Sequence, residues 1–232
     1  MLVPEIAQGA APELEPVRAA SLAAIGRLCV AKPSAVLVLG AGPETRRYAA
    51  SSFGDFGRFG AVDVRVGFGR HNCAGASQMP LPLLVGAWLL GESTRQAETP
   101  SGRDTLRLGT VVAVDSPPGE CAALGRRLVD DPESRVGLLV MGDGSARRTD
   151  KAPGHHDGRA AGFDEGVAAA LAAADTDALS RLDPGLAAEL MAAGRAPWQV
   201  LAGAAEGRAW RSELLYADAP YGVGYFVASW AA

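Results

Sequence analysis

Apolar residues recur along this chain with two different periods, and the longer period predicts helices. Between residues 12 and 30 they return every three to five positions, which is the spacing of one face of an amphipathic helix. Residues 83–92 are apolar on most sides and predict a buried helix. A further helix is predicted after Pro117 and Pro118. The second half is rich in alanine and predicts helices over residues 160–174, 184–193 and 197–205.

Short apolar runs lie between these helices and predict strands. Residues 35–39 and 136–141 are continuous apolar runs, typical of strands buried on both faces. Residues 62–66 alternate apolar and charged side chains, and residues 109–114, 213–216 and 224–230 complete the set. Strands separated by helices of about a dozen residues predict an α/β three-layer sandwich, with a central, mostly parallel or mixed sheet and helices on both faces. We expect one domain over residues 1–232, because this length suits a single core.

Charge and composition exclude several partners. The 22 basic and 26 acidic residues are scattered, so no basic stripe is present for nucleic acid. The longest apolar run, residues 81–90, is about half the length that spans a bilayer, which argues against a membrane protein. No signal-peptide pattern is present, and the cysteines are odd in number, so we expect a reduced, cytoplasmic protein. The apolar content of 48% permits a homo-oligomer without placing an interface.

The loop after residues 136–141 carries the first candidate chemistry. Asp143 and Ser145 stand at the carboxyl end of a buried strand, where they could polarise a ligand or fix a water. Capping of a helix or turn by Asp143 is the alternative that we favour slightly. Arg147, Arg148 and Lys151 make the loop positive and could attract the carboxylate of an aromatic acid, although a solvated run of charge is the commoner meaning of such a cluster.

Two glycine-containing segments offer further candidates. Gly40-Ala41-Gly42-Pro43 ends the first strand, and we interpret it as a tight turn because the third glycine of a dinucleotide-binding loop is missing. In Tyr221-Gly222-Val223-Gly224-Tyr225 the glycines permit close backbone approach and the aromatic rings could line an apolar pocket. The simpler role of this segment is to let the last strand pack.

The histidines and cysteines make a poor metal site. His155 and His156 are adjacent, so they seldom direct both side chains at one ion, and we expect them at the surface. His71 and Cys73 could share a soft metal with Cys29 or Cys121, but only if the tertiary fold brought them together, which their spacing in the sequence does not predict. We expect the cysteines to act as small buried hydrophobes.

Three sequence motifs carry a resemblance to a known family. Gly142-Asp143-Gly144-Ser145, followed by Ala152-Pro153-Gly154 and Phe163-Asp164, resembles the Gly-Asp-Leu-Ser-His, Ala-Pro and Phe-Asp pattern of the class III extradiol dioxygenases, the LigB-like proteins, and their Memo-like relatives. Residues 215–225 are similar to the closing motif, in which Tyr-Glu-Gly-Pro-Phe precedes Gly-Val-Gly-Tyr. Residues 39–43 match more weakly, where relatives carry Ser-Pro-His-x-Pro. The matches extend from residue 39 to residue 228.

The resemblance implies an iron site that this sequence has lost. In the family, two histidines and a glutamate hold Fe(II), and another histidine moves protons. Ala41 stands where one ligand is expected, and Ala146 stands where the acid–base histidine is expected. The family's N-terminal His-Pro strand is truncated or absent here, and an upstream extension could restore one weak metal ligand. Asp218 or Glu213 would replace the glutamate.

We therefore expect a pseudoenzyme without a cofactor, which binds a small aromatic molecule or serves as a scaffold. The alternative is an active Fe(II) extradiol dioxygenase with a non-standard ligand set, drawn from Asp218, Glu213 and His71, with His155 or His156 as further candidates. The candidate pocket is expected where three loops converge at one edge of the sheet. Its residues are Gly40, Ala41, Gly42, Pro43, Asp143, Ser145, Ala146, Asp218 and Tyr221.

Overall fold

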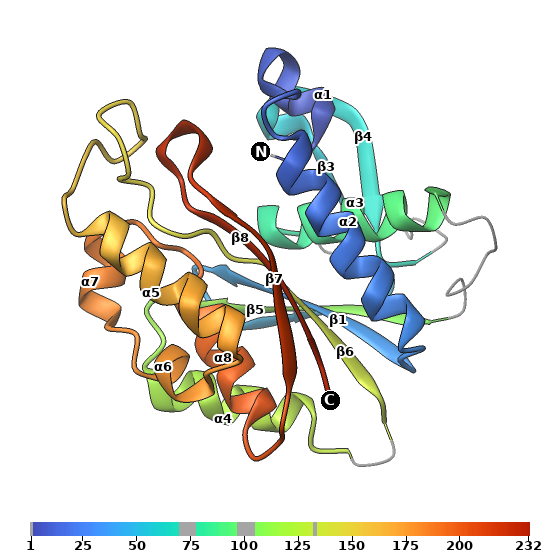
Figure 1. The fold of residues 1–232 in the computed structure, drawn as a ribbon. Helices are drawn as coiled ribbons and strands as arrows, with labels where there is room; N and C mark the ends of the chain where they lie inside the picture. Colours follow the sequence, from blue (N-terminus) through green and yellow to red (C-terminus); the bar gives the residue numbers. More distant parts are fainter. Residues whose placement is uncertain (1, 70–77, 97–104, 132–133) are drawn as a thin grey trace. The chain divides into compact units, whose positions relative to one another are not determined.

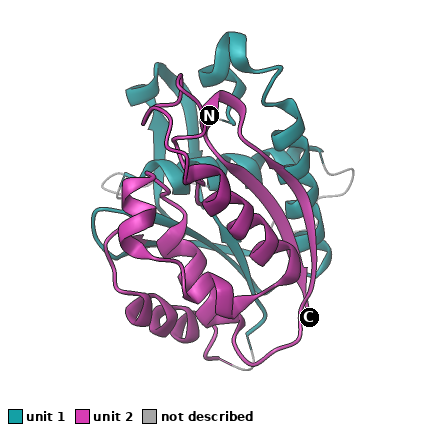
Figure 2. Cartoon of the chain, turned by 60° about the vertical axis from the view of Figure 1, so that its left-hand side comes forward, with its two compact units in different colours: residues 1–111, 133–141 teal, residues 112–132, 142–232 magenta. Residues whose placement is uncertain are grey.

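The computed structural model describes residues 2–69, 78–96, 105–131 and 134–232. It divides into two compact units, which are coloured separately in Figure 2. Unit 1 comprises Met1–Val111 and Glu133–Met141, and unit 2 comprises Val112–Pro132 and Gly142–Ala232. The prediction of one domain over residues 1–232 stays a prediction, and each unit is described in its own right.

Unit 1 contains a mixed four-stranded sheet with the order β2-β5-β1-β6 (Figure 1). β1 (Ala35–Gly42) pairs in parallel with β6 (Val136–Val140), with Val38 opposite Leu139. β2 (Arg46–Tyr48) pairs antiparallel with β5 (Leu106–Ala113). The predicted α/β class and the mixed character of the sheet are confirmed.

Helices pack on this sheet within unit 1. α3 (Leu81–Gln96) contacts β1, and Leu83, Leu84 and Leu89 on it are buried. α2 (Glu15–Val30) packs against α3 through an apolar face that includes Val17 and Ile25. Burial of such side chains away from water is the main favourable contribution to folding, at about 1.5–3 kcal/mol each. Both predicted helices are confirmed.

A short N-terminal helix and a hairpin complete unit 1. α1 (Pro4–Ala7) is followed by η1 (Gln8–Ala10), and α1 contacts β4. β3 (Phe53–Phe56) and β4 (Ala61–Gly67) form a separate two-stranded antiparallel sheet, joined by η2 (Gly57–Phe59). The alternating pattern of residues 62–66 predicted β4, whereas the short strands β2 and β3 were missed.

Unit 2 is built on a close helix pair. α4 (Pro118–Leu128) and α8 (Arg195–Ala205) pack with glycine on each helix facing the other. A Cβ on Gly203 would lie 2.2 Å from the Ala122 carbonyl oxygen, and one on Gly125 would lie 2.0 Å from that of Val200. The two backbones therefore approach more closely than any side chain allows.

Unit 2 also contains three further helices, a short 3-10 helix and two strands. They are α5 (Ala160–Ala173), α6 (Thr176–Ser180), α7 (Pro184–Glu189), β7 (Arg211–Asp218), η3 (Pro220–Gly222) and β8 (Tyr225–Ala231). β7 and β8 form a two-stranded antiparallel sheet with a bulge near Leu215, and α5 packs on both strands. The Trp230 indole nitrogen donates to the Leu171 carbonyl oxygen at 2.8 Å, which fixes the hairpin to the end of α5.

Several predicted boundaries were wrong. Gly40 and Gly42 do not form a turn, because β1 continues through Gly42. A Cβ on Gly40 would lie 2.5 Å from the Pro82 side chain, and one on Gly42 would lie 2.4 Å from Val111, so these glycines permit close packing of the strand. The helix predicted over residues 184–193 ends at Glu189, and α6 was not predicted. Among the described residues, no helix has the length and apolar character needed to cross a membrane.

Candidate functional site

A buried contact between Ser145 and Asp164 lies at the centre of unit 2. Ser145 is in the loop after β6 and is fully shielded from solvent, and Asp164 on α5 is 1% exposed. The Ser145 backbone N–H donates to one carboxylate oxygen of Asp164 at 2.8 Å, and the Ser145 hydroxyl donates to the other at 2.7 Å. Both oxygens of the aspartate are thereby satisfied, which a buried carboxylate requires.

Arg148 supplies the positive charge for this aspartate. Its guanidinium lies 3.3 Å from the Asp164 carboxylate, and the arginine side chain is 28% exposed. An ion pair of this kind compensates a buried negative charge, and removal of one partner is costly because the other is left without compensation. Ser145 and Arg148 are therefore committed to a structural contact and are not available to a ligand as the sequence suggested.

The C-terminal glycine segment closes over the same contact. The Gly144 N–H donates to the Gly224 carbonyl oxygen at 2.8 Å, and the Gly224 N–H donates to that of Ser145 at 2.8 Å. The Arg148 N–H donates to the Gly222 carbonyl oxygen at 3.1 Å. A Cβ on Gly224 would lie 2.6 Å from the Asp164 carboxylate, so only glycine permits this approach. The loop after β6 and the segment before β8 are consequently held together by backbone hydrogen bonds.

The far end of the loop is held by charged side chains. The Asp157 N–H donates to the Arg147 carbonyl oxygen at 3.0 Å. Arg159 donates to the Asp157 carboxylate and, at 2.7 Å, to Glu189. These hydrogen bonds hold the pKa of Asp157 well below its usual value and raise the pKa of Arg159. Residues 142–159 are thus anchored at both ends.

Asp143 differs from Ser145 in remaining accessible to solvent. Its carbonyl oxygen accepts from the Gly194 N–H at 2.8 Å, while no described residue hydrogen-bonds to its carboxylate, so it caps neither a helix nor a turn there. Partial desolvation of the carboxyl group by the surrounding protein nevertheless raises the pKa of Asp143. Burial, together with the negative charges that Asp143 and Tyr216 would carry, raises the pKa of Tyr225 to about 12.

Ala146 is tied into the loop by its backbone. Its N–H donates to the Leu190 carbonyl oxygen at 3.0 Å, and its own carbonyl oxygen accepts from the Gly154 N–H at 3.0 Å. The methyl side chain is partly exposed and offers neither a metal ligand nor a proton. Tyr221 and Gly222 adopt the left-handed backbone conformation, with φ of 58° and 75°.

A shallow pocket of about 440 Å³ lies beside this loop in unit 2. Tyr221 is one of its walls and is 48% exposed. The prediction that Tyr221 belongs to a ligand pocket stays a prediction. Sequence reasoning had named Lys151 as a positive residue of the loop and Gly222 as part of the glycine segment. It missed Thr149, Asp150 and Ala219, because short polar residues after a charged run are typical of a solvated turn. The pocket is lined by Thr149, Asp150, Lys151, Ala219, Tyr221 and Gly222.

The other predicted pocket residues do not line this cavity. Asp143, Ser145 and Ala146 belong to the loop after β6 but do not line the pocket, and Ser145 is fully buried. Asp218 is exposed next to Ala219 and accepts from the Ala219 N–H at 2.7 Å. Gly40, Ala41, Gly42 and Pro43 belong to unit 1.

Among the described residues, the predicted iron ligands do not come together. Asp218 and Glu213 both lie on β7, five residues apart, and a strand advances about 3.3 Å per residue, so the two are roughly 16 Å apart and cannot serve one ion. His155 and His156 are exposed, and His71 and Cys73 lie outside the described residues. Cys121 is buried, with its thiol against the Ser116 carbonyl oxygen, and burial raises the pKa of the Cys121 thiol. Within residues 2–69, 78–96, 105–131 and 134–232, no group of three or more His, Cys, Asp or Glu side chains could hold a metal.

Fold and site together define an α/β protein in which a loop packed against a glycine segment lies beside a small pocket. Comparison with protein-family models gives no match to any part of the chain. Comparison with curated proteins also gives no match.

Proposed function

We propose that this chain is a divergent relative of the LigB-like extradiol dioxygenases that binds a small aromatic carboxylate and performs no iron-dependent ring cleavage. In this proposal the fold is the three-layer sandwich of that family, and the protein acts in the cytoplasm. Free thiols at Cys29 and Cys121 favour that compartment, because an oxidising compartment favours disulfides.

The observation that carries the proposal is the contact in unit 2 between two of the resembling stretches, residues 142–164 and residues 215–225. Ser145 from the Gly-Asp-Gly-Ser stretch bonds Asp164 from the Phe-Asp pair, and Gly224 from the closing motif covers both. Ser145 and Asp164 belong to one matched stretch, and the closing motif, about 60 residues further along, was matched separately. Their packing into one contact supports a common origin, because unrelated short matches have no reason to be neighbours.

The absence of iron chemistry in the proposal follows from side-chain chemistry. Ala41 and Ala146 occupy the positions at which the resemblance expects histidine. Asp218 is left as an exposed carboxylate that bonds its neighbour's N–H. Fe(II) in this class of enzyme needs two imidazoles and a carboxylate on one face, and these residues do not provide them.

The pocket chemistry indicates the ligand class. Lys151 and Thr149 are exposed and both line the pocket, so an ammonium and a hydroxyl are available there to a carboxylate. Tyr221 contributes a half-exposed ring on which a planar ligand can stack. The size of the cavity suits one aromatic ring with its substituents.

The chain offers a direct test because Lys32 and Lys151 are its only lysines. Reductive dimethylation with labelled formaldehyde retains the positive charge and gives each lysine its own NMR signal. Titration with benzoate should shift the Lys151 signal saturably and leave the Lys32 signal in place. Benzamide, which keeps the ring and lacks the charge, should shift it far less.

Variants provide the matched control. Lys151→Met should weaken benzoate binding by about tenfold, measured by calorimetry, whereas Lys32→Met in unit 1 should leave it unchanged. A Lys151 signal that does not respond to benzoate at any concentration would refute the proposed ligand class. Equal shifts of both lysine signals would show nonspecific ion binding and would refute it as well.

A further inference from the structure

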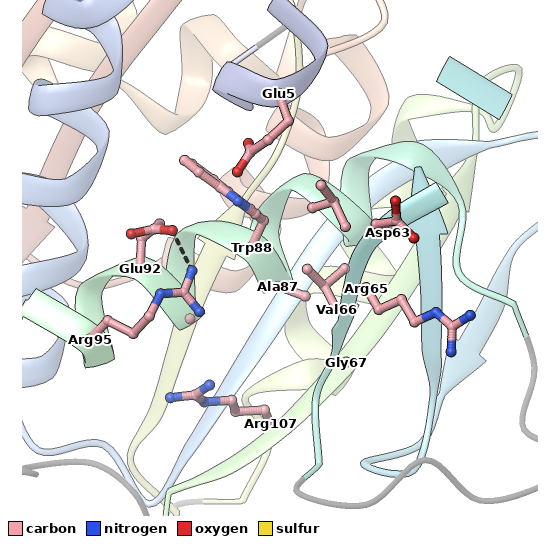
Figure 3. A pocket seen from close by; sticks show the side chains of 12 residues that line it. Glu5, Asp63, Arg65, Val66, Gly67, Ala87, Trp88, Glu92, Arg95 and Arg107 are labelled. Atoms are coloured by element: carbon pink, nitrogen blue, oxygen red, sulfur yellow. Dashed lines mark hydrogen bonds and ion pairs between the residues drawn. The ribbon is translucent and has the colours of Figure 1, made fainter. Parts of the chain in front are cut away.

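A second cavity, of about 370 Å³, lies in unit 1 and is lined by residues from α1, β4, α3 and β5, several of them charged (Figure 3). β4 contributes five consecutive residues, from Asp63 to Gly67. α3 contributes one face, including Trp88, Glu92 and Arg95, and β5 contributes Arg107. We call this cavity the β4 groove. Its residues play no part in the unit 2 site.

The lining by consecutive β4 residues shows that the groove follows the edge of the strand. Successive side chains of a strand point to opposite faces, so a cavity on one face would be lined by every second residue only. In the described structure β4 pairs with β3 alone, in a two-stranded sheet. The opposite edge of β4 has no strand partner among the described residues, and an unpaired edge is a template for another extended chain.

Arg107 makes one end of the groove basic. Its guanidinium is half-buried and donates to the Thr94 hydroxyl at 2.9 Å, a neutral partner. Burial lowers the pKa of Arg107, and no carboxylate among the described residues pairs with it. The neighbouring Arg95 differs, because Glu92 already neutralises it. A partly desolvated guanidinium with a neutral partner favours an incoming carboxylate.

The other end of the groove is acidic. Glu5 from α1 and Asp63 from the start of β4 are exposed there, and neither has a described ion-pair partner. In the view of Figure 3, Glu5 and Asp63 lie above Ala87 and Arg107 lies below it. From Asp63 to Gly67 the strand advances four residues, which corresponds to about 13 Å.

We propose that the β4 groove binds a short extended peptide of about three residues with both termini free, because three extended residues span about 10 Å. The peptide adds to the open edge of β4 by backbone hydrogen bonds. Its C-terminal carboxylate pairs with Arg107 and its N-terminal ammonium lies near Glu5 and Asp63. Since Arg107 is at the Gly67 end, the peptide runs parallel to β4. Half-buried Val64 and Val66 face α3 and favour small apolar side chains.

The test uses one tripeptide, Ala-Val-Ala, in four chemical forms with the full chain, measured by calorimetry. The free form should bind, and C-terminal amidation should weaken binding by about tenfold, because the charge that Arg107 recognises is lost. N-terminal acetylation should weaken it by a smaller factor, because Glu5 and Asp63 are exposed. N-methylation of the central amide keeps both charges and removes a backbone donor, so it should also weaken binding.

Two arginine variants separate recognition from folding. Arg107→Gln should lower the affinity for the free peptide by about tenfold and leave the affinity for the amidated peptide unchanged. Arg107→Lys should retain part of the preference for the free peptide over the amidated one. Arg127→Gln, at an exposed position of α4 in unit 2, is the control and should change neither. Equal binding of free and amidated peptides, or no binding of any form, would overturn the inference. Benzoate titration of the Lys151 signal is independent of this result, so the two proposals fail separately.

Discussion

The Ser145 hydroxyl donates a 2.7 Å hydrogen bond to the Asp164 carboxylate, although the two residues are 19 positions apart and both are shielded from solvent. This contact gives Ser145 a structural role. From its position in a loop after a buried strand, the sequence had instead suggested that Ser145 contacts a ligand or a water. It also explains why Gly144 and Gly224 are glycine, since a Cβ on either would lie within 3 Å of the aspartate carboxylate. The loop geometry of unit 2 depends on this aspartate.

Replacement of Asp164 should therefore destabilise the protein strongly. Asp164→Ala leaves the Ser145 hydroxyl and N–H without acceptors and removes the partner of Arg148. Loss of a buried, hydrogen-bonded charge costs about 3–5 kcal/mol, and the partial exposure of Arg148 places the expectation at the lower end. Urea unfolding measures this change in free energy. Glu165→Ala, at the adjacent exposed position of α5, should change it by less than about 0.5 kcal/mol.

The glycines of the unit 2 helices provide a second matched pair. Gly203→Ala places a methyl group 2.2 Å from the Ala122 carbonyl oxygen and should cost about 1–3 kcal/mol through overpacking. Gly162→Ala in α5 meets no atom within 4 Å and should stabilise by roughly 0.5–1 kcal/mol, because alanine is the better helix former. Thermal unfolding distinguishes the two directions. An unchanged or raised unfolding temperature of Gly203→Ala would contradict the close approach of α4 and α8.

Periodicity predicted the long elements well, because the spacing of their apolar residues matches the face that each element buries. α2, α3 and β4 each satisfy one strong pattern. β2 and β3 were missed because strands of three and four residues show no period. The boundary at Gly40 failed for another reason: glycine usually breaks a strand, but here it permits Pro82 to pack against β1.

The candidate site was predictable only where chain position decided it. The loop after β6 and Tyr221 were named from sequence, and Tyr221 lines a pocket. The structural role of Ser145 could not be predicted, because its burial depends on Asp164, which lies on α5 and contacts it in the fold. The Phe163-Asp164 pair was visible as part of a motif, yet nothing in its sequence context marked the aspartate as the acceptor for the loop.

Tyr225 should give the protein a pH dependence at high pH. Burial and the Asp143 charge raise the pKa of this phenol to about 12, above its ordinary value of 10. The unfolded chain therefore loses the phenol proton first as pH rises, so the stability that this group contributes is complete below about pH 10 and is lost between about pH 10 and 12. Tyr225→Phe should flatten that fall in the unfolding free energy. A parallel fall in the variant would contradict the assignment, and ultraviolet titration of the phenolate gives a direct check.

Iron binding is the measurement that separates the two readings of the family resemblance. We expect anaerobic incubation with Fe(II), followed by desalting and elemental analysis, to leave far less than one iron per chain. The reason is physical: Asp218 is exposed and accepts from its neighbour's N–H, and Ala41 and Ala146 supply no imidazole. Asp218→Ala should retain the same small amount as the unaltered protein. Stoichiometric iron that disappears in Asp218→Ala would instead establish a carboxylate-held ferrous site, and oxygen uptake with catechols would then test ring cleavage.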